Sequence, residues 1–374
     1  MVTVREVKTG KDIKKFVNFP LKLYKKCKYF VPCLYADEMN LLKGKTSYSD
    51  IADTKFFIAE RDGKTVGRIQ AIIQRQYNEL HGEKRIRFTR FDSIDDVEVS
   101  NALFAAVEAY GKECGMTKLC GPLGYSDLDR EGLLIEGFDQ TQTFEEQYNY
   151  DYYPKLTEAY GLTKEIDWLE FRLFAPENKA NPFGRLAERV LEMQKLHIAD
   201  RNVPKKDYIN KYADGAFECI DRCYSHLYGT VPFTEAMKKE LIDQFLLVLD
   251  PRYLVMVCDE NEKVVAFALC FPAMGEAVRK SGGKLTPLTL IKLLRAVKKP
   301  KAIDLGLIAV LPEYQNSGVN AVFMDYILET LISGEIEYFE TNLNLETNHQ
   351  VMAQWKYVKA VNHKRRRAYH KDIT

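Results

Sequence analysis

Two stretches of the chain, one in each half, share the same order of apolar and polar positions. In the first half, apolar-rich runs at residues 55–60 and 65–74 flank Asp62 and Gly63. An Asp-Gly pair between such runs is a strong hairpin signal. In the second half, residues 253–271 repeat the order of strand, polar turn and strand. Each hairpin is followed by another strand, a helix and a further strand. The simplest interpretation is an internal duplication of one α/β unit.

The spacing of the remaining apolar positions predicts the other elements. In the first half we expect strands at 2–7, 86–94, 118–123 and 166–174, and helices at 11–19 and 101–114. In the second half we expect helices at 207–227, 234–249, 321–332 and 347–356, and strands at 303–310 and 336–346, followed by a closing strand. This order predicts an α/β fold with mixed, mostly antiparallel sheets (α+β in character) flanked by helices.

At 374 residues the chain is long for a single hydrophobic core, so two domains are expected. The expected boundaries are 1–176 for the first domain, 177–204 for a helical linker that contains prolines, and 205–374 for the second domain. Residues 121–162 are rich in glycine, acids and tyrosine. They form either a substrate-facing loop or an interdomain loop packed by its own aromatic side chains.

Composition narrows the class of protein. Apolar residues make up 46% and charged residues 29% of the chain, and the net charge of +1 gives no overall attraction to nucleic acid or membrane. Eight scattered cysteines without a CxxC pair suggest reduced thiols and a cytoplasmic location. Cys219 and Cys223 lie one helical turn apart, but no histidine stands at ligand spacing, so we expect core packing and no metal. We find no signal peptide and no membrane span.

Residues 303–321 are the most informative stretch. A buried strand ends at Pro312, because proline cannot donate to a strand ladder. A turn that contains Gly318 then leads into a helix. Such a turn directs several unpaired backbone N–H groups, and the positive end of the helix dipole, at one small volume. A ligand that carries a pyrophosphate is therefore the first hypothesis.

Basic residues gather between the second hairpin and this strand, at 274–301. The favoured interpretation is a solvated amphipathic helix that covers a sheet end. The alternative is a cationic lid over phosphates or a segment that faces an anionic surface. A second basic run, at 364–367, is expected to be a solvent-facing strand, since no stacking aromatics are interleaved with it.

The second half resembles the GCN5-related N-acetyltransferases, the GNAT superfamily. Val310-x-Pro312-Glu313-Tyr314-Gln315-x-x-Gly318-x-Asn320-Ala321 is similar to motif A of that family, and Asn348 to its motif B. The resemblance covers 205–374 well and the first half only as a degenerate copy. The whole chain, including the segments GPLGYSD and GLLIEGFD, also resembles a group of bacterial tandem-GNAT proteins. The resemblance implies two tandem GNAT-like domains, of which the second holds the acyl-CoA site.

In this family the motif A turn binds the pyrophosphate of an acyl-coenzyme A through backbone amides. The resemblance therefore implies acetyl-CoA or another acyl-CoA as co-substrate, and no metal. The cofactor-binding residues that it implies are Ile308, Ala309, Val310, Gln315, Asn316, Ser317, Gly318, Val319, Asn320, Ala321 and Asn348. The sequence departs from the family at Asn320, where glycine is usual and where a side chain now stands near the expected diphosphate.

The resemblance also implies catalytic residues. Family members carry a general base six residues before the end of the strand, which is Asp304 here, and Glu340 is a second candidate. The alternatives are an edge-of-strand aspartate in water and a structural salt-bridge partner. The family's acidic tyrosine is replaced by Trp355, so Tyr357 is the nearest substitute and Tyr369 another. Backbone N–H groups at residues 308–310 would polarise the thioester carbonyl.

The expected function is acyl-CoA-dependent N-acyl transfer, in the first instance acetyl transfer to an amine of a small molecule or peptide, with the second domain catalytic. One alternative is a non-catalytic acyl-CoA-binding or scaffold protein, which Asn320 and Trp355 would support. The other is an aminoacyl-tRNA-dependent transferase, against which the near-neutral net charge argues. We expect neither nucleic acid nor membrane as partners.

Overall fold

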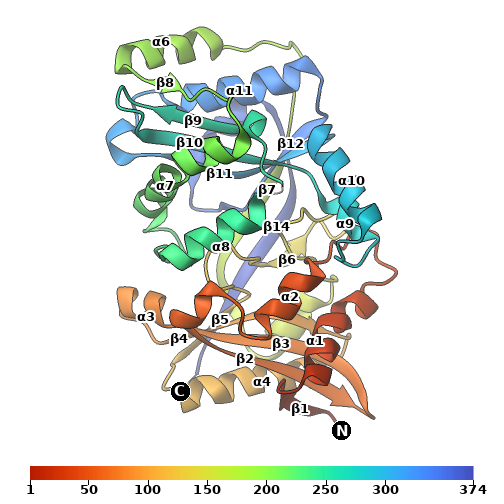
Figure 1. Ribbon diagram of the computed structural model, residues 1–374. Coiled ribbons are helices and arrows are strands. Elements are labelled where there is room, and N and C mark those ends of the chain that lie inside the picture. The colour runs from red at the N-terminus through yellow and green to blue at the C-terminus, as the bar shows by residue number, and fades with distance from the viewer. Residues whose placement is uncertain (247, 374) are drawn as a thin grey trace. The chain divides into compact units, whose positions relative to one another are not determined.

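The computed structural model describes residues 1–246 and 248–373 (Figure 1). The chain divides into two compact units that are interleaved in sequence. Unit 1 comprises Met1–Leu169, Gly275–Leu290 and His363–Thr374, and unit 2 comprises Glu170–Met274 and Ile291–Asn362. These units differ from the contiguous segments 1–176, 177–204 and 205–374. The reason is that β7 (Thr163–Phe174) and β14 (Lys359–Asp372) each cross from one unit into the other.

Unit 1 has a mixed sheet. Its strand order is β1 (Thr3–Glu6), β2 (Ala52–Arg61), β3 (Lys64–Gln74), β4 (Arg85–Ser93), β5 (Lys118–Gly121) and β14, and β6 (Leu133–Glu136) also pairs with β14. β4 and β5 run parallel, whereas β2, β3 and β14 are antiparallel to their neighbours. Its helices are α1 (Gly10–Leu23), α2 (Tyr35–Leu41), η1 (Ser47–Asp50), α3 (Arg75–His81), α4 (Val97–Glu113), α5 (Tyr153–Ala159) and α9 (Gly275–Arg279).

Local signals in the sequence explain several of these elements. Asp62 and Gly63 have φ of 51° and 72°, the left-handed conformation that a two-residue hairpin turn between β2 and β3 requires. The side chain of Asp96 accepts hydrogen bonds from the N–H groups of Glu98 and Val99. This cap starts α4 at Val97, four residues before the predicted start. α4 then lies across β2, β3 and β4 (Figure 1).

The long segment at residues 121–162 is packed by its own tyrosines. The ring centroids of Tyr148 and Tyr150 lie 5.8 and 4.9 Å from that of Tyr24, on the preceding part of unit 1. The hydroxyl of Tyr24 donates to that of Tyr153 at 2.7 Å. The aromatic-packing alternative therefore describes this segment, which also forms β6 and α5.

Unit 2 repeats the plan of unit 1. Its strand order is β7, β12 (Tyr338–Thr341), β11 (Ala302–Val310), β10 (Val264–Pro272), β9 (Leu254–Cys258) and β8 (His197–Ile198). Its helices are α6 (Gly184–Gln194), α7 (Lys205–Tyr224), α8 (Glu235–Phe245), η2 (Pro251–Tyr253), η3 (Pro312–Tyr314), α11 (Asn320–Ser333), α12 (His349–Met352) and η4 (Ala353–Tyr357). α10 (Pro287–Lys298) contains the boundary at 290/291, and the strand predicted at 336–346 is divided into β12 and β13 (Asn344–Leu345).

The core of unit 2 lies on both faces of its sheet. α11 buries Met324, Ile327 and Leu328 against Ile303 and Phe339 of the parallel strands. α7 lies against β10 and β11 (Figure 1). No helix in the described part of the chain is long and apolar enough to cross a membrane. All eight cysteines are free.

A buried ionic cluster ties α2 to the sheet of unit 1. Glu38 is 6% exposed, and the guanidinium of Arg90 lies 2.8 Å from its carboxylate. Arg68 lies 3.6 Å from Glu38 and 2.7 Å from Asp92. Burial by itself would raise the pKa of Glu38, but the charges of Arg90 and Arg68 and the hydrogen bond from Arg90 outweigh burial and lower this pKa to about 2.

We expect the Glu38→Gln variant to lose about 3 kcal/mol of unfolding free energy, because a buried guanidinium is left without its counter-charge. The pKa of Glu38 is lower in the folded protein than its ordinary value of 4.5. The stabilisation is therefore complete above pH 4.5 and is lost as the pH falls toward 2. Urea unfolding followed by tyrosine fluorescence at several pH values measures both effects.

The matched control is Glu113→Gln. The Glu113 side chain is 73% exposed, and its carboxylate lies 3.9 Å from the Lys55 amine. This variant should change the unfolding free energy by less than about 1 kcal/mol. Equal effects of the two substitutions would contradict a stabilising role for the buried cluster.

Candidate functional site

One edge of β11 in unit 2 is left without a neighbouring strand. The parallel pairing of β11 with β12 ends at Leu305 and Thr341, whereas its pairing with β10 continues to Val310. Gly306 is an extra residue in β11, because Leu269 pairs with Leu307 and Cys270 pairs with Leu305. Such a bulge bends the strand and ends its pairing on one side. Beyond Leu305, β11 therefore presents backbone polar groups toward α7 rather than toward another strand.

The side chain of Tyr224, at the C-terminal end of α7, occupies this open edge. Its hydroxyl donates to the carbonyl oxygen of Ile308 at 2.9 Å and accepts from the Ile308 N–H at 3.3 Å. The Leu311 N–H donates to Val265 of β10. Because antiparallel bonding alternates along a strand, the Val310 N–H points to the open edge. Tyr224 is not among the residues predicted from the sequence, since only the packing of α7 brings it to β11.

The turn after β11 gathers backbone donors, as the sequence predicted. Asn316 and Gly318 have φ of 61° and 91°. Within the described residues, the N–H groups of Asn316, Gly318, Val319 and Asn320 find no acceptor, and no side chain caps α11. Unpaired N–H groups at the N-terminus of a helix form a site that suits an anion. The turn has the geometry of an anion cradle.

Two glycines make this arrangement possible. A Cβ on Gly318 would lie 3.0 Å from Val190 of α6, in addition to the strain of a positive φ. A Cβ on Gly306 would lie 2.6 Å from the ring of Phe271. Position 320 does not require glycine, because Asn320 is the first residue of α11 and has no positive φ. Its side chain is exposed.

Other residues implied by the resemblance form hydrogen bonds within the turn or are buried beside it. The Gln315 side-chain amide donates to the Val310 carbonyl at 3.0 Å, and the Ser317 hydroxyl donates to the Tyr314 carbonyl at 2.6 Å. Ala309, Val319 and Ala321 are buried. These contacts hold the strand and the turn in one conformation.

Asp304 and Glu340 lie side by side on the sheet face opposite α11. They are register partners in the parallel pair β11–β12, and Glu340 pairs in turn with Arg172 of β7. Partners in register project to the same face. The Nε of Arg172 lies 3.2 Å from Glu340. Asp304 and Glu340 are 8% and 4% exposed, so neither is a solvated edge residue.

Burial and the charges of Glu340 and Arg172 shift the pKa values of neighbouring side chains. Burial raises the pKa of Tyr338, the negative charge of Glu340 raises it further, and Arg172 opposes the shift. Burial likewise raises the pKa of the Cys270 thiol to about 12. This thiol stays protonated at neutral pH and is a poor nucleophile.

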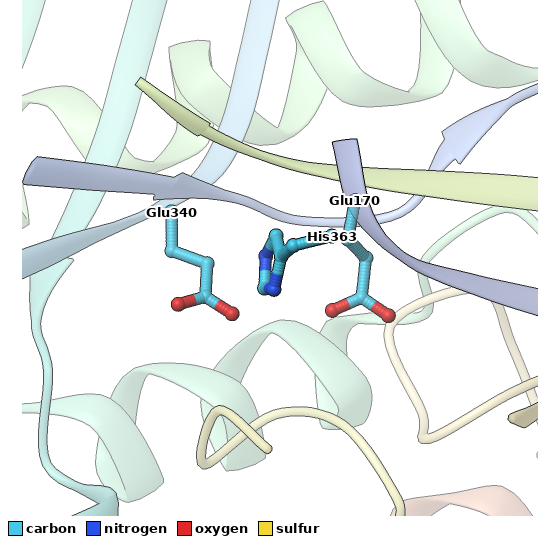
Figure 2. Close-up of side chains that lie close together, drawn as sticks. All are labelled: Glu170, Glu340 and His363. Atoms are coloured by element: carbon cyan, nitrogen blue, oxygen red, sulfur yellow. The ribbon is translucent and has the colours of Figure 1, made fainter. Parts of the chain in front are cut away.

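A second buried carboxylate, Glu170, precedes Arg172 by two residues on β7 and therefore projects to the same face. Figure 2 shows Glu170 and Glu340 together with the imidazole of His363, from β14. Side chains of these types can bind a metal ion, but acidic groups also gather where no ion binds. The geometry assigns no metal, and the absence of a metal stays a prediction.

Two other implied residues, and the tryptophan that replaces the family's tyrosine, lie away from these contacts. The Asn348 side chain caps α12 by accepting from the Val351 N–H at 3.3 Å. Tyr357 is 44% exposed, and its ring packs at 4.9 Å on that of Phe183. Trp355 is 5% exposed in the core beneath α11. Among the contacts of the described residues, none joins Tyr357 to the open edge of β11.

The equivalent edge in unit 1 is filled by the chain itself. β4 also carries a bulge, at Arg90, and its parallel pairing with β5 ends at Arg87 and Cys120. Beyond that point the Leu123 N–H donates to the Phe88 carbonyl at 2.9 Å. The Asp96 carboxylate already occupies the N-terminus of the following helix. Unit 1 therefore has the same strand geometry without the open edge or the anion cradle.

Comparison with known proteins places this geometry in context. No protein-family model matches the chain. Protein YghO of Escherichia coli (strain K12) is 28% identical over 376 residues, which cover 99% of this chain and 95% of that protein. Bacterial ceramide synthase of Caulobacter vibrioides (strain NA1000 / CB15N) is 29% identical over 324 residues, which cover 84% of this chain and 82% of that protein.

Solved structures share the fold at low sequence identity. A tandem GNAT protein from the clavulanic acid biosynthesis pathway matches 100% of this chain and 99% of its own, with a TM-score of 0.55 and 11% identity. A glucosamine N-acetyltransferase region of a fungal multi-domain β-N-acetylglucosaminidase matches 99% of this chain and 38% of its own, with a TM-score of 0.56 and 10% identity. The predicted fold is confirmed: the chain has the tandem GNAT-type fold, with mixed α/β sheets flanked by helices.

Proposed function

We propose that the protein is an acyl-CoA-dependent N-acyltransferase and that unit 2 carries the reaction. The observation that supports this most directly is the bulged strand β11, whose open edge leads into a turn of unpaired N–H groups at the start of α11. The tandem GNAT-type fold supports acyl transfer as the general class of activity. Unit 1 lacks both features, which favours unit 2 over unit 1 as the catalytic unit.

Acyl-CoA would occupy the edge and the turn together. Its pyrophosphate would accept hydrogen bonds from the N–H groups of Gly318, Val319 and Asn320. Its pantetheine arm is extended and carries two amides, so it would pair with β11 as an additional strand would. The Val310 N–H is available for this pairing, whereas the Tyr224 hydroxyl must leave the backbone of Ile308.

The reaction needs no covalent intermediate on the protein. The amine nitrogen attacks the thioester carbonyl, the C–S bond breaks, and coenzyme A leaves as a thiolate that takes a proton. Asp304 would accept the proton of the amine, with Glu340 beside it held by Arg172. Once the Tyr224 hydroxyl has left it, the Ile308 N–H would stabilise the developing oxyanion, and the Val310 N–H would remain for the pantetheine arm. We propose the Tyr224 hydroxyl as the proton donor to the leaving thiolate, because it contacts the open edge of β11. The predicted donor Tyr357 instead packs on Phe183.

One relative suggests a further class of acceptor. A ceramide is an N-acylated long-chain amino alcohol, and one protein that is 29% identical to this chain bears the name ceramide synthase. We therefore add long-chain amines to the small-molecule and peptide amines expected from the sequence. A non-catalytic acyl-CoA binder would be stabilised by acyl-CoA but would release no thiol. A tRNA-dependent enzyme would neither be stabilised by acyl-CoA nor release thiol from it.

We expect acetyl-CoA or a longer acyl-CoA to stabilise the wild-type protein, by about 2.7 kcal/mol at a concentration of one hundred times Kd. We expect Gly318→Ala to abolish this effect, because the new Cβ lies 3.0 Å from Val190 and the required φ of 91° is strained. Thermal unfolding with and without ligand measures both.

Gly334→Ala is the matched control. Gly334 ends the same helix with a φ of 76°, and an added Cβ would lie in open space. This variant should lose about 1 kcal/mol of stability and keep ligand stabilisation. If no coenzyme A derivative shifts the melting temperature of the wild-type protein, the proposal fails.

We expect Asp304→Asn to lower kcat by roughly 10²- to 10⁴-fold with unchanged acyl-CoA affinity, because the amide cannot accept the amine proton. Thiol release from acyl-CoA in the presence of amines, including a long-chain amine, measures turnover, and calorimetry measures binding. Glu340→Gln tests the second carboxylate in the same way. Unchanged turnover in Asp304→Asn would remove Asp304 from this role.

A further inference from the structure

The surface of α10 exposes a concentration of apolar side chains. Of the fourteen large apolar side chains that are exposed in the described residues, five lie between residues 285 and 294. They are Leu285, Leu288, Leu290, Ile291 and Leu294, with exposed fractions of 47%, 61%, 37%, 48% and 46%. A solvated amphipathic helix carries polar residues on its outward face, so this face is unlike the one expected from the sequence.

All of these residues except Leu285 lie within α10, where they form one side of the helix. At about 100° per residue, Leu290, Ile291 and Leu294 project to one side of α10, and Leu288 adjoins them. Thr289 and Leu293, each 4% exposed, mark the inward side. Leu290 and Ile291 stand on either side of the unit boundary but belong to one continuous helix, and the surface considered is that of the helix alone.

Positive charge borders this apolar stripe. Residues 277–303 contain no aspartate or glutamate, yet they contain eight lysines and arginines. Lys292, Arg295, Lys298 and Lys299 are exposed, and none has an ion-pair partner among the described residues. By helical spacing Lys292, Arg295 and Lys299 lie around Leu288 at one side of the stripe, and Lys298 lies at its C-terminal end. The rest of the chain balances this charge, because the net charge is only +1.

We propose that α10 is an interfacial helix that binds an anionic lipid surface. Apolar side chains along one stripe, with lysine and arginine beside it and no acid, are the features by which a helix lies in the plane of a membrane interface. The absence of acidic residues favours anionic lipid headgroups over a protein surface of mixed charge. Twelve residues are too few to span the hydrocarbon core, which takes about 20 residues.

Lipid binding by α10 differs from one expectation from the sequence and is independent of the proposed reaction. The near-neutral net charge suggested no membrane partner, but the charge is segregated, and an interfacial helix responds to its local patch. A failure of acyl-CoA binding would leave the lipid inference intact, and the reverse also holds. If both hold, α10 would bring the protein to the surface from which a long-chain amine is taken.

The test is sedimentation of the full chain with vesicles of phosphatidylcholine alone or mixed with phosphatidylglycerol. The wild-type protein should sediment with the anionic vesicles only, and less so at high salt. Ile291→Ser/Leu294→Ser should weaken vesicle binding by about tenfold or more, because apolar burial is lost. Lys292→Gln/Arg295→Gln should weaken it roughly 30-fold. Circular dichroism and thermal unfolding establish that the variants fold.

The matched control is Leu186→Ser/Met193→Ser on α6, where the two side chains are 45% and 71% exposed. This variant should bind vesicles as the wild-type protein does. The proposal is overturned if the wild-type protein does not sediment with anionic vesicles, or if both α10 variants bind as well as the control. It is also overturned if sedimentation velocity shows a wild-type dimer that Ile291→Ser/Leu294→Ser dissociates, because a second copy would then cover the face.

Discussion

One extra residue in β11 governs the arrangement of the candidate site. Gly306 bends the strand so that it leaves β12 after Leu305 while staying paired with β10. The separation leaves backbone groups of Ile308 and Val310 without a strand partner and aims the end of β11 at the donor-rich turn. It also sets Asp304 one residue before the last paired position, beside Glu340. The groups that we propose to polarise the carbonyl, bind the diphosphate and accept the proton thus follow from one irregularity in a ladder.

The two units show how the same strand geometry supports different outcomes. Both carry a bulge on the strand that precedes the main helix, at Arg90 and at Gly306. In unit 1 the bulged strand is satisfied by main chain through Leu123, and a carboxylate caps the helix. In unit 2 the backbone of Ile308 at the equivalent edge is bonded by one tyrosine side chain, which the proposed ligand would displace at the cost of two hydrogen bonds.

The sequence predicted features whose causes are local. The Asp62-Gly63 turn and the turn around Gly318 both depend on the conformational preferences of a few adjacent residues. The helix expected at 101–114 starts earlier, at Val97, because the side chain of Asp96 caps it. Tyr224 and Arg172 were missed, since each reaches the site only through tertiary packing. The interleaving of the units was missed for the same reason.

That interleaving bears on how the protein is made. Residues 365–372 of β14 pair with β5 and β6, which precede them by more than two hundred positions. During synthesis the β5 edge stays unpaired until every residue of unit 2 has left the ribosome. An uncovered sheet edge is a template for wrong pairing. The sheet of unit 1 is therefore completed only after unit 2 has been synthesised.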